Sequence, residues 1–308
     1  MGSTYNPSID QGALQQFRDN FLELAQQTKS ALGSSKAVMH LPSKGKTNNL
    51  GRIGKVELTE VEGRNPNKSY GDYSIDNRML TKRRFTKTIT IDKKNDINEL
   101  IRDPQSDILK QIVNAKERVI DRVIASAAAG PVLVGAPDAA PSSISAATDG
   151  VITLNAVSGL TYAIIQQVTQ KFINNDMSYE MFRGSALCIS GKENTDLMQE
   201  PQFINNDYIS ARPVEAGKMN NAGIYEVKLF AGSENGGITV SSPILPESGA
   251  YRSCLVLAPE SVALAMEIGD LSVEKNPLKV NSMDITIDLW INAMRTEGAR
   301  VIILTTTI

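Results

Sequence analysis

The chain is poor in the residues that most often carry out enzyme chemistry. Its 308 residues include one histidine, two cysteines and one tryptophan. Histidine is the side chain that most readily exchanges protons near neutral pH. The single histidine, His40, has no Cys, Asp or Glu around it at the spacing of metal ligands. The sequence therefore predicts neither acid–base catalysis nor a metal site at this residue.

The two cysteines do not indicate a disulfide. Cys188 and Cys254 each lie inside an apolar run. This setting is typical of small buried thiols in a reducing compartment. We therefore expect both cysteines to be free.

Long apolar segments are also missing. Residues 1–10 are polar and contain no apolar secretory core, and no run of about 18 apolar residues occurs in the chain. We expect neither secretion by that route nor a membrane span.

An excess of charge of one sign is absent as well. The chain has 32 basic and 34 acidic residues, a net charge of -2. Proteins that grip nucleic acid through its phosphates carry a basic excess. We therefore expect any contact with DNA to be weak or confined to patches.

The hydrophobic content of 41% is sufficient for a folded core in one large domain or two smaller ones.

Two glycine-containing segments lack the features of a phosphate site. Gly217-Lys218 has neither the earlier glycine nor the following Ser or Thr of a phosphate-binding loop. The glycine-rich segment 232–237 precedes a strand pattern instead of opening a helix. We interpret the first as a loop and the second as a hairpin turn.

Neither the serines nor the paired carboxylates of the chain indicate a catalytic site. Ser190 and Ser253 do not lie in a Gly-x-Ser-x-Gly elbow, and no second histidine is available to activate them. Asp284 and Asp288 fall on one face of a predicted strand, at a spacing that a solvated strand face also produces. We favour solvation over catalysis for this pair.

What the chain does have is a strand followed by a long helix. In residues 84–91, Phe85, Ile89 and Ile91 alternate with threonines, which predicts a half-buried strand. After a polar break, Asp103-Pro104 is a helix start, and apolar residues then recur at helical spacing up to Gly130. The pattern predicts a helix from Pro104 to about Ala129, roughly 37 to 40 Å long at 1.5 Å per residue.

A second strand precedes the first one. In residues 56–61, Val56, Leu58 and Val61 alternate with acidic and threonine side chains. We predict that this strand pairs with residues 84–91 across a polar tip, residues 62–82. An isolated two-stranded ribbon is marginal in water, so we expect the hairpin to rest on another subunit or another domain.

The segments on either side of this region are less regular. Residues 10–27 have the pattern of an amphipathic helix. Residues 28–49 are rich in Ser, Gly, Lys and Asn and predict an extended arm without a core of its own. Residues 130–147, which follow the long helix, are small and predict a loop.

The remainder of the chain mixes helices and strands, as in an α+β layer structure. Helices are predicted around residues 160–172, 193–199 and 260–266, and strands at 186–190, 223–230, 253–257, 284–292 and 300–306.

Basic residues gather at the base of the predicted hairpin, opposite acidic residues on its other strand. Two interpretations remain open. The charges pair across the hairpin itself, or they provide complementarity between neighbouring subunits, which sets register and partner choice. The candidate contact residues are Arg78, Lys82, Arg83, Arg84, Glu57 and Glu60.

The order of these elements resembles the major capsid proteins of tailed double-stranded-DNA bacteriophages, of the Hong Kong 97 type. The likeness is carried by Lys82 to Ile91, by Leu100 to Ser106 and by Ala115 to Ala127. The family shows a similar arginine-bearing strand, an L-x-D-P-x-S segment and an A-x-x-R-x-x-D-x-x-I-x-A-A helix.

The resemblance implies a division of the α+β chain into four parts. These are an N-terminal arm with a short helix (1–50), an extended β-hairpin loop (51–95), a peripheral domain with a long spine helix (96–150 and 269–297) and an axial α/β domain (151–268 and 298–308).

It also implies a structural function without catalysis or cofactors. The protein would form pentamers and hexamers of an icosahedral shell that encloses the phage double-stranded DNA without sequence-specific binding and without a membrane. No long cleavable scaffolding segment precedes the capsid region, so a separate scaffolding protein is implied, with a portal and a decoration protein as further partners. Assembly would take place in the host cytoplasm, and the mature protein would reside in the virion.

Two other functions remain open. An encapsulin-like nanocompartment shares the fold and packages protein cargo, and residues 10–27 could be its anchoring helix. A soluble hydrolase is the alternative from a different class.

Overall fold

The computed structural model describes residues 27–42, 45–58, 60, 71, 73–92, 104–135, 141–200, 214–215, 218–219, 225–230, 244–279 and 282–308. The chain divides into two compact units. Unit 1 comprises residues 1–30, 84–119 and 267–290, and unit 2 comprises residues 31–83, 120–266 and 291–308.

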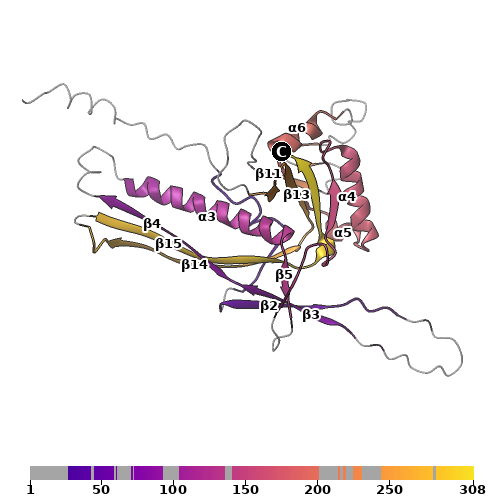
Figure 1. Ribbon diagram of the computed structural model, residues 1–308, viewed down its shortest axis with the longest axis horizontal. Helices are drawn as coiled ribbons and strands as arrows, with labels where there is room; N and C mark the ends of the chain where they lie inside the picture. The colour runs from indigo at the N-terminus through magenta and orange to yellow at the C-terminus, as the bar shows by residue number, and fades with distance from the viewer. Residues whose placement is uncertain are drawn as a thin grey trace, which may run out of the picture. The chain divides into compact units, whose positions relative to one another are not determined.

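The described helices and strands are labelled in Figure 1 where space allows. The helices are α3 (Pro104–Ala129), α4 (Tyr162–Asn174), α5 (Tyr179–Phe182), α6 (Gly191–Met198) and the 3-10 helix η2 (Gly298–Arg300). The strands are β1 (Val38–His40), β2 (Thr47–Ile53), β3 (Ile75–Thr81), β4 (Arg83–Asp92), β5 (Val132–Val134), β6 (Ser142–Ile144), β7 (Ile152–Asn155), β8 (Ser185–Ser190), β9 (Val214–Glu215), β10 (Lys218–Met219), β11 (Tyr225–Phe230), β12 (Glu247–Ser248), β13 (Tyr251–Leu257), β14 (Val262–Lys275), β15 (Ser282–Arg295) and β16 (Val301–Thr307).

Unit 1 is built from the first part of α3 and the strands beside it. The predicted helix is present with the bounds expected from its start and stop signals, and Figure 1 shows it running along β4, β14 and β15. Ile112 of the helix and Ile285 of β15 are buried together, and Leu109, Ile89 and Ile287 pack against them. The apolar stripe of the helix therefore covers the apolar face of the strands, as the two periodicities require.

The strands of this sheet follow the order β1-β14-β15-β4. β14 begins at Val262, so the helix predicted over residues 260–266 is wrong. The run from Val262 to Ala265 is buried, and Val262 pairs with Val38 of the parallel strand β1. A short apolar run of this kind does not distinguish a buried strand from a helix by periodicity alone.

The segment predicted as an arm without a core is also different in the structure. Leu32 and Ala37 are fully buried, and β1 lies within residues 28–49. The Asp121 carboxylate accepts hydrogen bonds from the backbone N–H groups of Ala31, at 2.9 Å, and of Leu32, at 3.0 Å. A few apolar residues and one buried carboxylate therefore fix a segment whose composition is mostly polar. The helix predicted over residues 10–27 lies, except for Gln27, outside the described residues.

The hairpin exists, but its strands are not those predicted. β2 pairs with β3 in an antiparallel register that runs from Thr47 opposite Thr81 to Ile53 opposite Ile75. β4 belongs to the other sheet, so the predicted pairing of residues 56–61 with residues 84–91 within one chain is wrong. Leu80 of β3 is buried in a cluster with Ala263, Ala265 and Met294, and this burial favours the observed register.

The segment predicted as a plain loop after α3 contains a short hairpin. β5 pairs with β6, and β5 also pairs with β3, so that β2, β3, β5 and β6 form one four-stranded sheet. Small residues are compatible with short strands as well as with loops, and composition did not separate the two here.

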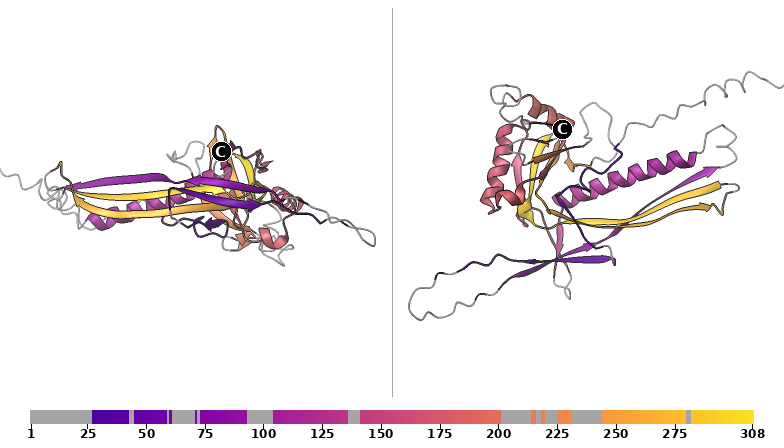
Figure 2. Two further views of the ribbon diagram at one scale, coloured as in Figure 1. Left: turned by 90° about the horizontal axis from the view of Figure 1, so that it is seen from below. Right: turned by 180° about the vertical axis from the view of Figure 1, so that it is seen from behind.

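The second sheet of unit 2 agrees with the sequence patterns. Its strands follow the order β7-β16-β13-β8-β11-β10-β9, with β12 paired to β13. The predicted strands at 186–190, 253–257 and 300–306 are present as β8, β13 and β16, and residues 225–230 of another form β11. β8 is buried along its whole length. Figure 2 shows α4 and α5 beside this sheet, and Phe172 and Phe182 of these helices stack at 5.8 Å.

Candidate assembly surface

The hairpin of β2 and β3 and the residues that continue it carry large apolar side chains on the surface of the protomer. Leu58 is 98% exposed, Ile53 74%, Val56 71%, Tyr73 61% and Ile75 60%. We call these five residues the hairpin strip. Grouped apolar exposure of this kind marks interaction sites in soluble proteins, whereas single exposed apolar residues need no explanation.

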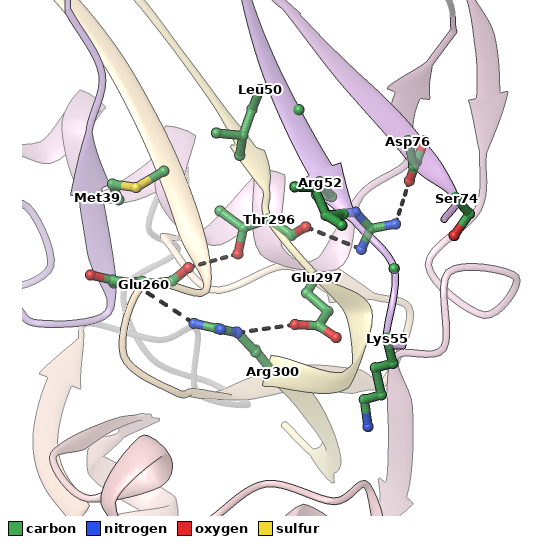
Figure 3. A pocket seen from close by; sticks show the side chains of 13 residues that line it. Met39, Leu50, Arg52, Lys55, Ser74, Asp76, Glu260, Thr296, Glu297 and Arg300 are labelled. Carbon is green, nitrogen blue, oxygen red and sulfur yellow. Dashed lines mark hydrogen bonds and ion pairs between the residues drawn. The ribbon is translucent and has the colours of Figure 1, made fainter. Parts of the chain in front are cut away.

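A cavity of about 500 Å³ lies at the base of the hairpin, and Figure 3 shows its lining. Arg52 of β2 pairs with Asp76 of β3, and its Nη1 donates a hydrogen bond to the carbonyl of Thr296 at 3.4 Å. On the opposite wall, Arg300 Nε lies 3.1 Å from the Glu297 carboxylate. The charges of these walls are thus balanced by ion pairs within the protomer. These contacts attach the hairpin base to the segment that joins β15 to β16.

A further ion pair lies where the hairpin strip begins. Lys55 Nζ is 2.9 Å from the Asp176 carboxylate, in the turn after α4. The hydrogen bond and the charge of Asp176 raise the pKa of Lys55. Both side chains are largely exposed, so water and salt screen the pair, and its contribution to stability is small.

The hairpin is anchored in the core of unit 2 by two buried arginines and one aspartate. Arg78 of β3 and Arg295 of β15 both pair with Asp149. Arg78 Nη1 also donates to the Arg295 carbonyl at 2.7 Å. Arg295 Nη1 donates to the carbonyls of Ala128, at 2.8 Å, and Gly130, at 2.9 Å. These carbonyls lie at the negative end of the helix macrodipole of α3, where a cation is favoured. We call Arg78, Asp149 and Arg295 the Asp149 cluster.

A second buried cluster surrounds Ser190, one of the serines considered as a nucleophile. The Glu193 carboxylate accepts hydrogen bonds from the Ser190 N–H at 3.0 Å and from the Thr306 hydroxyl at 2.8 Å. Arg252 Nη1 lies 3.2 Å from the same carboxylate. All four side chains are buried. This geometry ties α6, β13 and β16 together and leaves the Ser190 hydroxyl inaccessible to a substrate. Ser253 lies in β13, where its N–H donates to the carbonyl of Pro246 at 2.8 Å.

The two clusters make the subunit sensitive to acid. Burial alone would raise the pKa of Asp149 and of Glu193, but hydrogen bonds and the neighbouring arginine charges outweigh burial and hold both pKa values below normal. A carboxyl group with a lowered folded-state pKa stabilises the fold fully above its unfolded-state pKa, about 4. This stabilisation is lost as the pH falls through the folded-state value.

We therefore expect the urea midpoint of the unassembled subunit to fall between pH 5 and about pH 3. Chemical denaturation followed by circular dichroism measures this change. The variant Glu193→Gln removes one of the two groups and should show a shallower dependence on pH. An equal midpoint at both pH values would contradict the prediction.

The surroundings of the two cysteines and the single histidine determine how reactive these side chains are. Cys188 and Cys254 are free and buried. Burial raises the pKa of Cys254 to about 12, and that of Cys188 rises further, so neither thiol is poised to react. His40 Nε2 lies 2.9 Å from the Gly33 carbonyl. Within the described residues no three His, Cys, Asp or Glu side chains form a group that could hold a metal ion.

The structure separates the sequence-predicted contact residues into two groups. Arg78 is fully buried in the Asp149 cluster, and Lys82 is 4% exposed. These two therefore present almost no surface to a neighbouring subunit. Arg83, Glu57 and Glu60 are exposed.

Arg84, the remaining candidate, pairs with a strand of the sheet and not with the hairpin. Its Nη2 lies 2.6 Å from the Asp288 carboxylate, and its guanidinium carbon lies 5.7 Å from the centre of the Trp290 ring. Pairing across the hairpin is thus wrong for Arg78 and Arg84.

The two acidic residues on one face of β15 both have protein partners. Asp288 pairs with Arg84, and Asp284 accepts a hydrogen bond from the Asn276 side chain at 3.1 Å. Gly217 and residues 232–237 lie outside the described part of the chain.

A sequence model of the family described as "Phage capsid protein" matches residues 9–307. The chain belongs to this family. A search of curated protein sequences returned no match for this capsid protein.

Solved capsid structures share its fold at low sequence identity. The capsid of the cyanophage P-SCSP1u is 11% identical, with a TM-score of 0.62, and the alignment covers 95% of this chain and 94% of that chain. The mature capsid of bacteriophage PhiM1 is 12% identical, with a TM-score of 0.63 and coverage of 94% and 90%. The head of Helicobacter pylori bacteriophage KHP40 is 9% identical, with a TM-score of 0.63 and coverage of 94% and 93%.

These comparisons confirm the α+β fold of the Hong Kong 97 type and the function of a major capsid protein that forms the phage head shell. The protein is therefore a structural component of the virion capsid. The encapsulin-like and hydrolase alternatives are not favoured. Among the described helices, none is long and apolar enough to cross a membrane.

Proposed function

We propose that this capsid protein assembles into pentamers and hexamers, and that the hairpin strip holds neighbouring subunits together. The observation that carries the proposal is the exposure of five large apolar side chains on and beside a two-stranded ribbon. β5 pairs with β3 only at Arg78 and Met79, so the outer end of the hairpin is two-stranded, and a two-stranded ribbon is marginal in water unless its side chains pack against something. In a closed shell every copy can both donate a hairpin and receive one.

The energetic gain from this packing is substantial. Burying a large apolar side chain completely contributes about 1.5–3 kcal/mol. Five partly buried side chains per hairpin can therefore offset much of the entropy that association costs. Because each subunit in a closed shell has several neighbours, modest contacts sum to a stable particle.

The division of the chain into an arm (1–50), an extended loop (51–95), a peripheral domain (96–150 and 269–297) and an axial domain (151–268 and 298–308) is part of the same proposal. The exposed charges Arg83, Arg84, Glu57 and Glu60 are the contact residues that we retain. A scaffolding protein, a portal and a decoration protein are proposed partners during assembly in the host cytoplasm.

The shell is proposed to enclose double-stranded DNA without reading its sequence and without catalysing a reaction. The net charge of -2 supports a shell that surrounds DNA more than a protein that binds the DNA phosphates tightly. The buried position of Ser190 supports a structural role over a hydrolytic one.

Electron microscopy of the expressed protein, with and without a co-expressed scaffolding protein, tests the proposal. We expect capsomers or polyhedral shells in at least one condition, and nucleic acid inside particles purified from infected cells. A monodisperse monomer under every condition would contradict it. Particles that contain a cargo enzyme and no nucleic acid would instead support the nanocompartment alternative.

A further inference from the structure

The cavity at the base of the hairpin contains one acidic side chain beyond those that its ion pairs balance. The balanced charges around the cavity are the pairs Arg52–Asp76, Lys55–Asp176 and Arg300–Glu297. Glu260 also lines the cavity, and Figure 3 shows that Glu260 and Glu297 share Arg300 as their nearest cation. Among the lining residues and these pair partners, one negative charge is therefore in excess.

Arg300 is already occupied by other partners. Its Nε lies 3.1 Å from the Glu297 carboxylate, and its Nη1 donates a hydrogen bond to the Pro259 carbonyl at 3.1 Å. The Glu260 carboxylate is 4.0 Å from Nη1, which is too long for a hydrogen bond. The side chain of Glu260 is also 68% exposed. Glu260 thus has room for a second cation that comes from outside the protomer.

The backbone at Glu260 is held in an unfavourable conformation. Its φ of 56° lies in the left-handed region, which favours Gly and Asn over a residue such as Glu. The residue lies in a turn in which the Ser261 N–H donates to the Ala258 carbonyl at 3.1 Å. The Glu260 N–H donates to the Lys36 carbonyl at 2.9 Å, and the Glu260 carbonyl accepts from the Thr296 hydroxyl at 2.6 Å. Residues held in this way cluster at ligand-binding sites.

Apolar side chains form another part of the lining. Met39 and Leu50 line the cavity and are partly buried against the cluster around Leu80. The volume of about 500 Å³ is that of a typical ligand pocket. A carboxylate beside apolar surface fits a cation on an aliphatic stem, because the stem packs while the charged end pairs. One excess negative charge fits a side chain with a single positive charge better than a free diamine, which carries two.

We propose that the cavity binds a lysine side chain of a second copy of the chain, with the ammonium group on Glu260 and the methylene groups against Met39 and Leu50. The second copy is assigned because Ile53, which is 74% exposed, belongs both to the lining and to the hairpin strip. The cavity is therefore continuous with the proposed assembly surface. This inference rests on the proposed shell function and adds one specific polar contact to it.

Zero-length cross-linking of assembled shells tests this contact. A water-soluble carbodiimide joins a carboxylate to an amine that touches it, with loss of water. Unlabelled and isotopically labelled subunits of this protein alone are mixed before assembly, and the cross-linked peptides are identified by mass spectrometry. We expect Glu260 to be joined to a lysine in peptide pairs that combine the two isotopes. Unassembled subunits should give no such pairs.

The pair of Lys55 and Asp176 is the internal control, because its two groups are 2.9 Å apart within the protomer. Its cross-link should form in both samples and join only residues of the same isotope. Shells with the control link and without the Glu260 link would overturn the proposal. A Glu260 link found only to a different virion protein, in particles from infected cells, would overturn the assignment to a second copy. Failure of the wild-type protein to form shells would overturn the shell function and this inference with it.

Substitutions at Glu260 separate its charge from its backbone strain. Glu260→Gln keeps the size and removes the charge, so each contact should weaken up to about fivefold, the factor for one partly exposed ion pair. Shells of this variant should dissociate at a lower urea concentration. Glu260→Gly also relieves the left-handed backbone, so its unassembled subunit should resist more urea than the wild type while its shells resist less.

Glu180→Gln is the matched control, because it removes an exposed charge in α5, away from the cavity lining. It should change neither the subunit nor the shells. Circular dichroism follows the unfolding of the subunits, and light scattering follows the dissociation of the shells. Glu260→Gln shells as resistant to urea as the wild type would overturn the proposal.

Discussion

Replacing residues 55–73 by an Asn-Gly turn should leave a folded subunit that forms no closed shells. The N–H of Gly54 donates to the carbonyl of Ser74 at 2.8 Å, so these two residues are already placed to flank a two-residue hairpin turn. The replacement removes Val56, Leu58 and Tyr73 of the hairpin strip while keeping every buried residue of β2 and β3. Circular dichroism and sedimentation velocity check the fold, and electron microscopy checks assembly.

The deletion must not extend into β3. Arg78 and Leu80 are buried, and removing them would unfold the subunit for reasons unrelated to assembly. In a second variant, an unrelated Gly/Ser sequence of equal length replaces residues 56–73. This variant keeps the length of the loop and removes its side-chain contacts. We expect it to fail in assembly as well. Closed particles of normal size from either variant would show that the hairpin strip does not hold the shell together.

The sequence predicted the elements whose local signals and packing agree. α3 has a proline start, a single apolar stripe and a glycine stop, and it spans the predicted residues. β8 and β13 are short apolar runs between polar segments, and both are central strands of the large sheet. Local propensity, periodicity and burial give the same answer at these positions.

The errors arose where a few long-range contacts decide the structure. β3 is Ile-Asp-Asn-Arg-Met-Leu-Thr, a polar segment whose buried side chains include an arginine. No periodicity rule predicts a buried Arg78, because its burial depends on Asp149, which is distant in the sequence. The alternating pattern at residues 56–61 predicted a strand, but residues 56–58 and 60 lie outside regular structure in the protomer.

The same reasoning explains why the two buried charge clusters were not predicted. Arg252 and Arg295 each adjoin an apolar strand segment, and a charged residue there is normally expected at a solvated strand end. Their carboxylate partners, Glu193 and Asp149, come from a helix and a turn elsewhere in the chain. Predicting these clusters from the sequence would require knowing which segments lie next to each other in the folded chain.

Asp149→Asn should strongly destabilise the subunit, because it leaves Arg78 and Arg295 buried without a counter-charge. Removing one partner of a buried ion pair costs about 3–5 kcal/mol. Urea denaturation of the unassembled subunit at pH 7 measures the loss. The control Asp288→Asn also removes an arginine partner, but in a pair with much greater exposure, so it should have little effect.

The pH dependence distinguishes loss of the charge from loss of packing. The lowered pKa of Asp149 means that the wild-type carboxylate keeps its charge until the pH falls below the ordinary carboxyl range. The stability difference between the wild type and Asp149→Asn should therefore shrink as the pH falls towards 3, since the unfolded wild-type chain then binds a proton at Asp149 that the folded protein does not yet bind. A difference that stays constant from pH 7 to pH 3 would show that Asp149 acts through its shape and hydrogen bonds. In that case the arginines that fix the base of the hairpin would not depend on its charge.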